Sequence, residues 1–202
     1  MRPWSSNGTQ IASGSYDNTV MIWDASTGGK VSELKGHSSP VNSLAWSPNG
    51  EQIASGSYDN TVIFWDASSG NQISVLNGHT ETVYSVAWNH SGDQISSGSA
   101  DKSVIVWDTS TGQRVTQLAG HAGEVNSVAW SPQGDLLASA SDDRSAIVWD
   151  VSTGSKAAEL RGHTDLVRSV AWSKDGRKIA TGSSDKSVMV WDAASGEQVY
   201  IG

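Results

Sequence analysis

The sequence predicts an all-β protein built from several small antiparallel sheets that recur along the chain. Short apolar segments alternate with segments rich in Gly, Ser, Asn and Asp, which is typical of strands joined by tight turns. The composition, with 21 Gly, 4 Pro and charged residues at 17%, suits such turns better than helices. The ten tryptophans follow a fixed spacing over 202 residues, a length that one all-β domain often reaches.

The tryptophans form two series in which neighbouring members are 42 residues apart: Trp4, Trp46, Trp88, Trp130, Trp172, and Trp23, Trp65, Trp107, Trp149, Trp191. The same step separates the Gly-His pairs that begin at Gly36, Gly78, Gly120 and Gly162, and the aspartates Asp17, Asp59, Asp101, Asp143 and Asp185. A period of this length with no insertion indicates internal duplication. The chain therefore divides into the units 1-35, 36-77, 78-119, 120-161 and 162-202.

Each unit is predicted to contain four short strands. In the unit that begins at Gly36 the expected strands are 41-47, 52-58, 61-67 and 72-77, separated by the turn-forming segments SPNG, YDN and SSGN. The first and third segments are apolar on both faces, as Val41, Leu44 and Trp46 illustrate, and such strands are covered on both sides. A small twisted sheet obtains that cover by stacking against the next copy of itself, and radial stacking gives a β-propeller with five four-stranded antiparallel blades per chain.

Four motifs recur at fixed positions: the starting Gly-His, the Ala-Trp-Ser-Pro strand end, the Ser-Gly-Ser-x-Asp turn and the closing Trp-Asp. Together they make the chain similar, over its entire length, to the WD-repeat (Trp-Asp repeat) β-propeller family. In that family each blade carries a structural tetrad in which Trp, a hydroxyl, His and Asp are hydrogen-bonded in series. The resemblance assigns this role to His37, Ser55, Asp59, Trp65; His79, Ser97, Asp101, Trp107; His121, Ser139, Asp143, Trp149; and His163, Thr181, Asp185, Trp191. The neighbouring column Ser57, Ser99, Ser141, Ser183 is an alternative source of the hydroxyl.

A Ser, His and Asp set also raises the alternative of a hydrolase. A nucleophilic triad needs an exposed hydroxyl and an oxyanion hole, and enzymes normally build one such site per domain. The set occurs four times here, as expected for a device that stabilises the fold, so we predict no catalytic residues. One His per blade cannot share a metal ion, His90 stands alone in a turn, and the Gly-rich segments precede no helix. We therefore expect no metal and no cofactor.

Charge and composition exclude several classes of partner. The formal net charge of −8 has the wrong sign for a general nucleic-acid surface, since phosphate contacts need clustered cations. No run of 18 apolar residues predicts a membrane span, and residues 1–10 have no apolar core of a signal peptide. The absence of cysteine fits a reducing compartment. We expect a cytoplasmic protein with a protein or peptide partner.

The resemblance implies that three variable columns surround the mouth of the central channel, where family members hold partner proteins and peptides. Tyr and Arg in these columns favour an interaction face, because such side chains dominate interface hot spots. The alternative is that these are solvent-exposed loop positions free to vary. The candidates are Tyr16, Pro40, Asn42, Tyr58, Thr82, Tyr84, Glu124, Asn126, Asp142, Leu166, Arg168 and Ser184.

Five units raise the question of ring closure. Met1 aligns with Ser43 and Gly202 with Leu34, so the chain has no counterpart of Lys35 through Asn42. Propellers of the family usually close with seven blades. We therefore expect an open arc whose apolar end faces drive association into a homo-oligomer, for example two arcs forming a ten-blade ring. A strained five-blade monomer and a piece of a longer array are the alternatives. The regular repeat also fits an amplified array, or an engineered or de novo repeat protein with no natural ligand and self-assembly as its main property.

Overall fold

A computed structural model describes residues 3–202 of the chain and contains 19 β-strands in five antiparallel sheets. The first sheet contains β1 (Gln10–Gly14), β2 (Thr19–Asp24) and β3 (Lys30–Lys35). The second contains β4 (Val41–Trp46), β5 (Gln52–Ser57), β6 (Val62–Asp66) and β7 (Gln72–Leu76). The third contains β8 (Val83–Trp88), β9 (Gln94–Ser99), β10 (Ser103–Asp108) and β11 (Arg114–Ala119). The fourth contains β12 (Val125–Trp130), β13 (Leu136–Ser141), β14 (Ser145–Asp150) and β15 (Ser155–Arg161), and the fifth β16 (Val167–Trp172), β17 (Lys178–Ser183), β18 (Val188–Asp192) and β19 (Gln198–Ile201).

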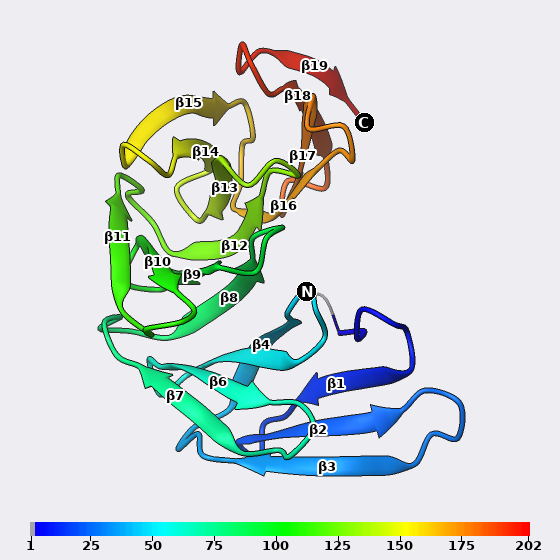
Figure 1. Ribbon diagram of the computed structural model, residues 1–202. Coiled ribbons are helices and arrows are strands. Elements are labelled where there is room, and N and C mark those ends of the chain that lie inside the picture. The colour runs from blue at the N-terminus through cyan, green and yellow to red at the C-terminus, as the bar shows by residue number, and fades with distance from the viewer. Residues whose placement is uncertain (1–2) are drawn as a thin grey trace.

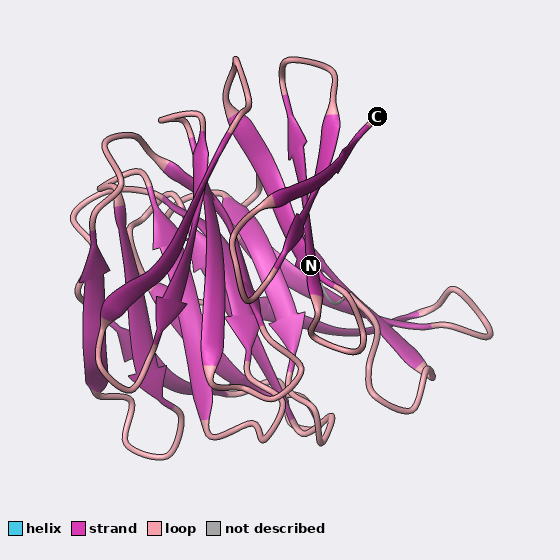
Figure 2. Cartoon of the chain, turned by 90° about the horizontal axis from the view of Figure 1, so that it is seen from above, coloured by secondary structure: helices cyan, strands magenta, loops and turns pink. Residues whose placement is uncertain are grey.

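The five sheets follow one another around a curved path (Figure 1). The first strands of the four-stranded sheets, β4, β8, β12 and β16, lie on the inner side of the curve and contact one another in that order. The last strands, β3, β7, β11, β15 and β19, lie on the outer side. Loops join the strands at both ends of each sheet (Figure 2). This arrangement is an arc of propeller blades, open between the first and fifth sheets.

The predicted strands agree with the observed ones to within one residue at each end. The predicted four-stranded first blade is wrong in detail, because the first sheet has three strands and its inner edge is reduced to a single bridge between Trp4 and Ile11. Met1 and Arg2, which the first unit includes, lie outside the described residues. The inner edge is therefore represented by the Pro3 and Trp4 pair, whose backbone still accepts the indole hydrogen bond of Trp46 at 2.9 Å.

Successive sheets bury apolar side chains between them. Between the second and third sheets, the Phe64 ring stacks on Trp88 with centroids 5.4 Å apart. Space for the next blade comes from a small-residue column in the second strand, where a Cβ on Gly56 would lie 2.6 Å from Val83 and one on Gly98 would lie 2.7 Å from Val125. The sheets thus pack face to face as closely as a protein interior requires.

The two end sheets of a single chain each leave one face uncovered, in agreement with the open arc that the number of units predicts. Trp4 of the first sheet is 52% exposed, whereas its counterpart Trp46 is 1% exposed. Val188 of the fifth sheet is 51% exposed, whereas its counterpart Val104 is 0% exposed. The difference arises because each end sheet has a neighbour on one side alone. Inner and end positions of the same repeat column therefore differ greatly in burial.

Candidate functional site

The second sheet shows how the repeated polar residues are connected. The Trp65 indole Nε1 donates to Ser55 Oγ at 2.8 Å. Ser55 Oγ lies 2.7 Å from His37 Nε2, and His37 Nδ1 lies 2.8 Å from Asp59 Oδ2. Ionised carboxylates accept hydrogen bonds and do not donate them, so Nδ1 carries the proton of a neutral ring and the serine hydroxyl donates to Nε2. The result is a series of hydrogen bonds directed from Trp65 through Ser55 and His37 to Asp59.

The same series recurs in the next three sheets with closely similar distances. The His to Asp contact is 2.8 Å in each, and the hydroxyl to His contact is 2.7 or 2.8 Å, with Thr181 replacing serine in the fifth sheet. The alternative hydroxyl column is engaged elsewhere: Ser57 Oγ donates to the Ser39 carbonyl and accepts from the Asp59 amide. The first sheet holds one of the three hydrogen bonds of the series, from Trp23 to Ser13 at 2.8 Å.

Burial excludes these hydroxyls from acting as nucleophiles. Ser55, Ser97 and Ser139 are 0% exposed and Thr181 is 1% exposed. A substrate carbonyl cannot reach them without opening the sheet, and each hydroxyl already accepts the hydrogen bond of a Trp indole. The geometry is that of a structural support.

The aspartate of each series connects two loops on one side of the arc. Asp59 Oδ2 accepts from the Ser38 backbone amide at 2.9 Å as well as from His37, while Oδ1 accepts from the backbone and hydroxyl of Thr61 at 3.0 and 2.6 Å. We call this side, with the loops after each Gly-His and the turns around each of these aspartates, the upper face. Two of the three variable columns lie in these same loops, and the third, which contains Asn42, is the second residue of each inner strand. The hydrogen-bond series therefore fixes the backbone that presents the candidate partner-binding residues.

Backbone hydrogen bonds join the two loop columns within each four-stranded sheet. The Tyr58 amide donates to the Pro40 carbonyl at 3.0 Å, and equivalent bonds join Ala100 to Thr82, Asp142 to Glu124 and Ser184 to Leu166. Columns separated by 18 residues in the sequence are thus adjacent on the upper face. Their side chains vary while their backbones are held in one geometry.

Tyrosines from three sheets form a row on this face. The ring centroids of Tyr16 and Tyr58 are 6.4 Å apart, and those of Tyr58 and Tyr84 are also 6.4 Å apart. Tyr16 is 82% exposed and Tyr58 39% exposed. The pKa of Tyr84 is raised to about 12, mainly by burial and to a lesser extent by the neighbouring Glu124 carboxylate. Since the phenol stays protonated at neutral pH, the row is an uncharged aromatic surface with Glu124 at its end.

A polar cluster continues the upper face over the fourth and fifth sheets. Arg168 Nη1 lies 3.1 Å from Asp142 Oδ1, and Arg168 Nε donates to Ser184 Oγ at 3.1 Å. Asn126 Nδ2 donates to the same Asp142 oxygen at 2.7 Å. Half of the Arg168 side chain surface remains exposed. The structure therefore brings together most of the predicted candidates, as an aromatic row beside a charged cluster. The Asn42 side-chain amide donates to the Tyr84 backbone carbonyl at 3.0 Å.

The aspartate of each Trp-Asp pair has a separate role at the opposite ends of the strands. Asp66 Oδ1 accepts from the backbone amides of Ser68 and Ser69 at 3.1 and 2.7 Å and from both hydroxyls. These hydrogen bonds, the Ser69 amide first, lower the pKa of Asp66 to about 2. The aspartate of the closing motif thus shapes a turn at this end of the strands and takes no part in the tetrad, whereas its neighbour Trp65 does.

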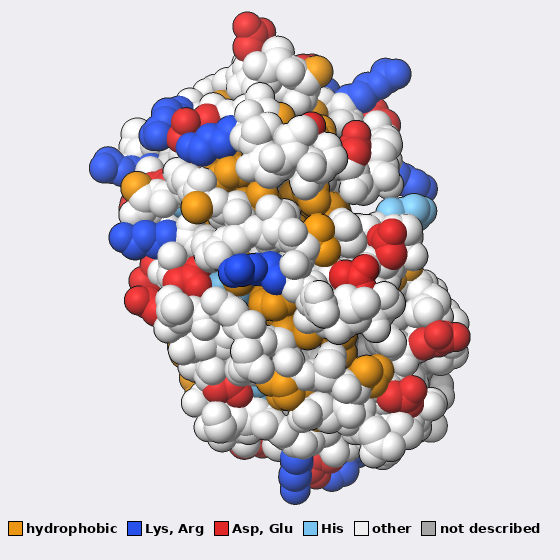
Figure 3. Space-filling model, turned by 60° about the vertical axis from the view of Figure 1, so that its left-hand side comes forward, with side chains coloured by type: hydrophobic (Ala, Val, Ile, Leu, Met, Phe, Trp, Pro, Cys, Tyr) orange, Lys and Arg blue, Asp and Glu red, His pale blue; other side chains and the backbone are white. Residues whose placement is uncertain are grey.

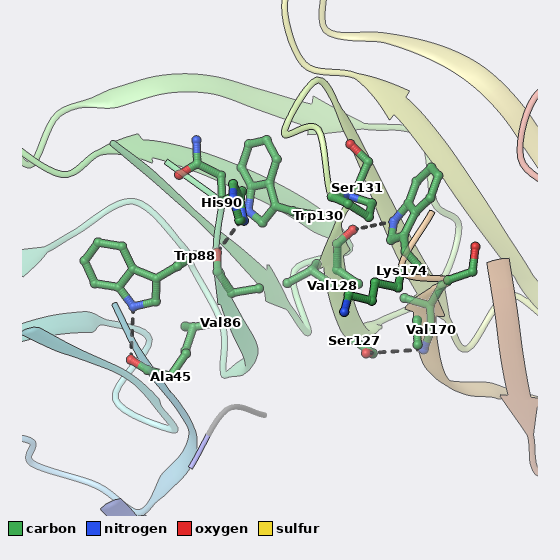
Figure 4. A pocket seen from close by; sticks show the side chains of 17 residues that line it. Ala45, Val86, Trp88, His90, Ser127, Val128, Trp130, Ser131, Val170 and Lys174 are labelled. Carbon is green, nitrogen blue, oxygen red and sulfur yellow. Dashed lines mark hydrogen bonds between the residues drawn. The ribbon is translucent and has the colours of Figure 1, made fainter. Parts of the chain in front are cut away.

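A cavity of about 760 Å³ lies at the lower ends of the inner strands, away from the upper face. Its wall includes Trp88, Trp130 and Trp172, with His90 and Lys174 in the loops that follow β8 and β16. Figure 4 shows the indoles of Trp88 and Trp130 bonded to backbone carbonyls of the preceding sheet, as the 3.0 Å contacts to Ala45 and Ala87 describe. Sequence analysis missed this hollow and set His90 aside as isolated. The variable column Ser6, Pro48, His90, Pro132, Lys174 was the signal that could have indicated it.

Residues 3–202 contain no group of three or more His, Cys, Asp or Glu side chains placed to hold a metal ion. Within the described part of the chain, no helix is long and apolar enough to cross a membrane. Figure 3, which looks onto the side where β11 lies, shows charged side chains of both signs scattered around smaller hydrophobic areas.

Acid should destabilise the fold as the buried polar series takes up protons. Burial lowers the pKa of His37 from its ordinary value of 6.5, against the opposing effect of Asp59. Burial would raise the pKa of Asp59, but hydrogen bonds from Thr61 and His37 outweigh it and hold the pKa below 3.8. For both groups the unfolded chain binds protons more readily, so stability decreases as the pH falls below about 6.5 and again below about 3.8. Melting temperatures measured from about pH 8 to pH 3 test this, and a rise in stability between about pH 7 and pH 5 would contradict a neutral buried His37.

Comparison with known proteins agrees with this geometry. Residues 19–193 match the family described as the WDR3 first beta-propeller domain, and residues 1–24 match the WD domain, G-beta repeat. A stretch of 45 residues is 49% identical to THO complex subunit 3 of Arabidopsis thaliana. That stretch is 20% of this chain and 14% of the length of the relative. With repeated blades, the hydrogen-bonded Trp, hydroxyl, His and Asp series, and a family match over most of its length, the chain belongs to the WD-repeat β-propeller family.

Proposed function

We propose that this chain is a non-enzymatic interaction scaffold that binds a partner protein or peptide on its upper face. The observation that carries the proposal is the row of Tyr16, Tyr58 and Tyr84, contributed by three successive sheets, in which Tyr16 and Tyr58 are exposed and Tyr84 is partly exposed. None of the three rings contributes to the tetrads. An aromatic row of this kind offers large contact area at low cost in side-chain entropy.

The chemistry of the face suits an extended peptide segment. Aliphatic and cationic side chains of a peptide bind favourably against tyrosine rings, and a cation placed there also approaches the Glu124 carboxylate. The Arg168 and Asp142 pair can bind backbone or carboxylate groups farther along the same segment. Family membership supports this role, because WD-repeat propellers are in general protein-interaction scaffolds. The Arabidopsis relative is, by its name, a subunit of a complex.

A displayed library of random peptides provides the test. We expect peptides selected on the wild-type chain to lose at least about tenfold in affinity for the Tyr58→Ala variant, because truncating a hot-spot aromatic typically costs more than about 1 kcal/mol of binding free energy. Dissociation constants from calorimetry or interferometry give the readout. Val115→Ala is the matched control, since Val115 is 50% exposed on β11, outside the upper face.

Two results would contradict the proposal. One is a set of selected peptides whose affinity is unchanged by Tyr58→Ala and by Arg168→Ala. The other is a loss of affinity for these peptides when His90 or Lys174 is replaced, which would place the binding site in the lower cavity. Thermal melts of each variant, run alongside, separate lost binding from lost folding.

A repeat protein whose main property is self-assembly into a closed propeller is the second candidate. The exposed apolar faces of the two end sheets favour it. Failure to select any peptide, together with a solution mass above that of one chain, would support this candidate over the first.

A further inference from the structure

The two end sheets present different uncovered surfaces. On the first sheet the uncovered side carries Trp4, Ile11, Met21 and Trp23, which we call the head face. On the fifth sheet it carries Ala180, Val188 and Val190, which we call the tail face. Trp4 and Val188 are 52% and 51% exposed, and the remaining side chains of both faces are partly exposed.

The residues that correspond to these two faces in other units are packed together at the interface between the first and second sheets. There Ala12, Val20 and Ile22, the counterparts of the tail face, pack in one buried cluster with the counterparts of the head face, which are Trp46, Ile53, Ile63 and Trp65. Exposure in this cluster does not exceed 8%. The chain thus already contains a well-packed example of a tail surface against a head surface.

A hydrogen bond accompanies this contact at each interface within the chain. The indole of the inner-strand tryptophan donates to a backbone carbonyl of the preceding sheet: Trp46 to Pro3, Trp88 to Ala45, Trp130 to Ala87 and Trp172 to Ala129, at 2.9 to 3.0 Å. Within residues 3–202 the Trp4 indole donates no hydrogen bond. The next carbonyl of the acceptor series is that of Ala171, on the exposed inner edge of the tail face.

The outer strand of the tail face differs from the outer strands of the other sheets at one column. The first four sheets place a leucine there, Leu34, Leu76, Leu118 or Leu160, each buried next to the turn glycine of the following sheet. The fifth sheet has Gly202 at this position, and a Cβ on Gly202 would lie 2.9 Å from the Tyr200 ring. The ring therefore occupies the space beside the missing leucine. On the head face the corresponding turn glycine, Gly28, has no atom within 4 Å of its Cβ position.

We propose that the tail face of one copy binds the head face of a second copy of this chain, in the register of the interfaces within the chain. Val190 then lies against the partner copy's Trp4, as Phe64 lies against Trp88, and the indole of that Trp4 donates to the Ala171 carbonyl. The surfaces differ, so the contact is head to tail, and two copies use each face once when they close into a ring. This association is independent of the upper face and of the function proposed for it.

Light scattering on the purified 202-residue chain tests the proposal, with a matched pair of variants on the fifth sheet. We expect the wild-type mass to be twice the 21.3 kDa of one chain, and Val188→Asp to reduce it to that of one chain. Val199→Asp is the control, because it introduces the same charge at a valine of similar exposure, 52%. Its counterpart in the third sheet, Val115, is also 50% exposed, so this column is not covered by a neighbouring sheet. This control should keep the wild-type mass. Circular dichroism verifies that both variants are folded.

Mixing two variants tests the direction of the contact. Trp4→Glu blocks the head face and Val188→Asp blocks the tail face, so each variant alone should have the mass of one chain. Their mixture retains one intact head and one intact tail and should form a heterodimer. A wild-type mass of one chain at every concentration would overturn the proposal. So would association of Trp4→Glu with itself, or equal effects of Val188→Asp and Val199→Asp.

Discussion

Replacing His121 with Ala should lower the free energy of unfolding by about 2–4 kcal/mol, because the change removes one hydrogen-bond partner from each of two largely buried groups and leaves a cavity. Ser139 Oγ, 0% exposed, loses its acceptor at 2.7 Å, and Asp143 Oδ2 loses its donor at 2.8 Å. For a chain of this size the loss corresponds to a decrease of about 5–15 °C in melting temperature. Calorimetry or circular dichroism melts provide the measurement.

Matched changes on the upper face should leave stability nearly unchanged. Tyr58 is 39% exposed, and the Arg168 to Asp142 ion pair is half exposed, so its contribution is about 0.2–1 kcal/mol. We expect Tyr58→Ala and Arg168→Ala to shift the melting temperature by less than about 3 °C. If Tyr58→Ala destabilised the chain as much as His121→Ala, the separation of structural tetrads from a binding face would be wrong.

The His121 variant should also loosen the upper face locally. Asp143 Oδ2 accepts from the Ala122 amide at 2.9 Å as well as from His121. Without the imidazole this carboxylate is free to rotate toward water, and the loop that carries Glu124 loses part of its anchor. Faster hydrogen exchange at Ala122, with little change in the outer strand β15, would show that the tetrad positions the loop in addition to stabilising the sheet.

Repetition made the strands and the polar series predictable from the sequence. A step of 42 residues aligns Trp65 with Trp107 and His37 with His79, so each copy tests the assignment made for the others. Hydrogen-bonding capacity then orders the partners, since indole donates and carboxylate accepts. The sequence did not decide which serine supplies the hydroxyl of the tetrad, because the choice between Ser55 and Ser57 depends on how each side chain is directed from β5. The structure places Ser55 toward His37 and Ser57 toward the Ser39 carbonyl.

Contacts between sheets were not accessible in the same way. The Arg168 to Asp142 ion pair joins residues 26 apart in the sequence, and it depends on how far one sheet rotates relative to the next. The lower cavity was missed because its walls come from Trp88, Trp130 and Trp172, which look alike in every unit. Candidate residues were those that differ between units. The lower cavity is lined mainly by a tryptophan column that is identical in every unit, so this criterion does not select it.

The burial of end faces could not be read from the repeat pattern either. Val104 and Val188 occupy one column, yet their exposures are 0% and 51%. The pattern specifies which side chains require cover, while the position of a unit in the arc decides whether a neighbour supplies it. Contact between sheets is therefore the main source of stability to be tested.

Replacing Phe64 with Ala should destabilise the chain by about 3–5 kcal/mol, the range for removing a fully buried aromatic side chain. Phe64 is 0% exposed, and its ring lies at 26° to that of Trp88 in the next sheet. The loss combines the cavity with the aromatic contact, which contributes about 0.5–1.5 kcal/mol beyond area burial. We expect a decrease of about 10–15 °C in melting temperature together with a change in Trp fluorescence as Trp88 loses its partner.

Phe64→Leu is the matched control, because it keeps most of the volume and removes the aromatic contact. It should cost less than about 1.5 kcal/mol. If Phe64→Ala cost as little as Phe64→Leu, the sheets would not depend on stacking for stability, and the exposed end faces would have no reason to seek a partner. A large cost at Phe64 would show instead that one side chain between two sheets contributes a substantial fraction of the free energy of unfolding. The partly uncovered Val190, in the same column, then marks stabilisation that a single copy leaves unused.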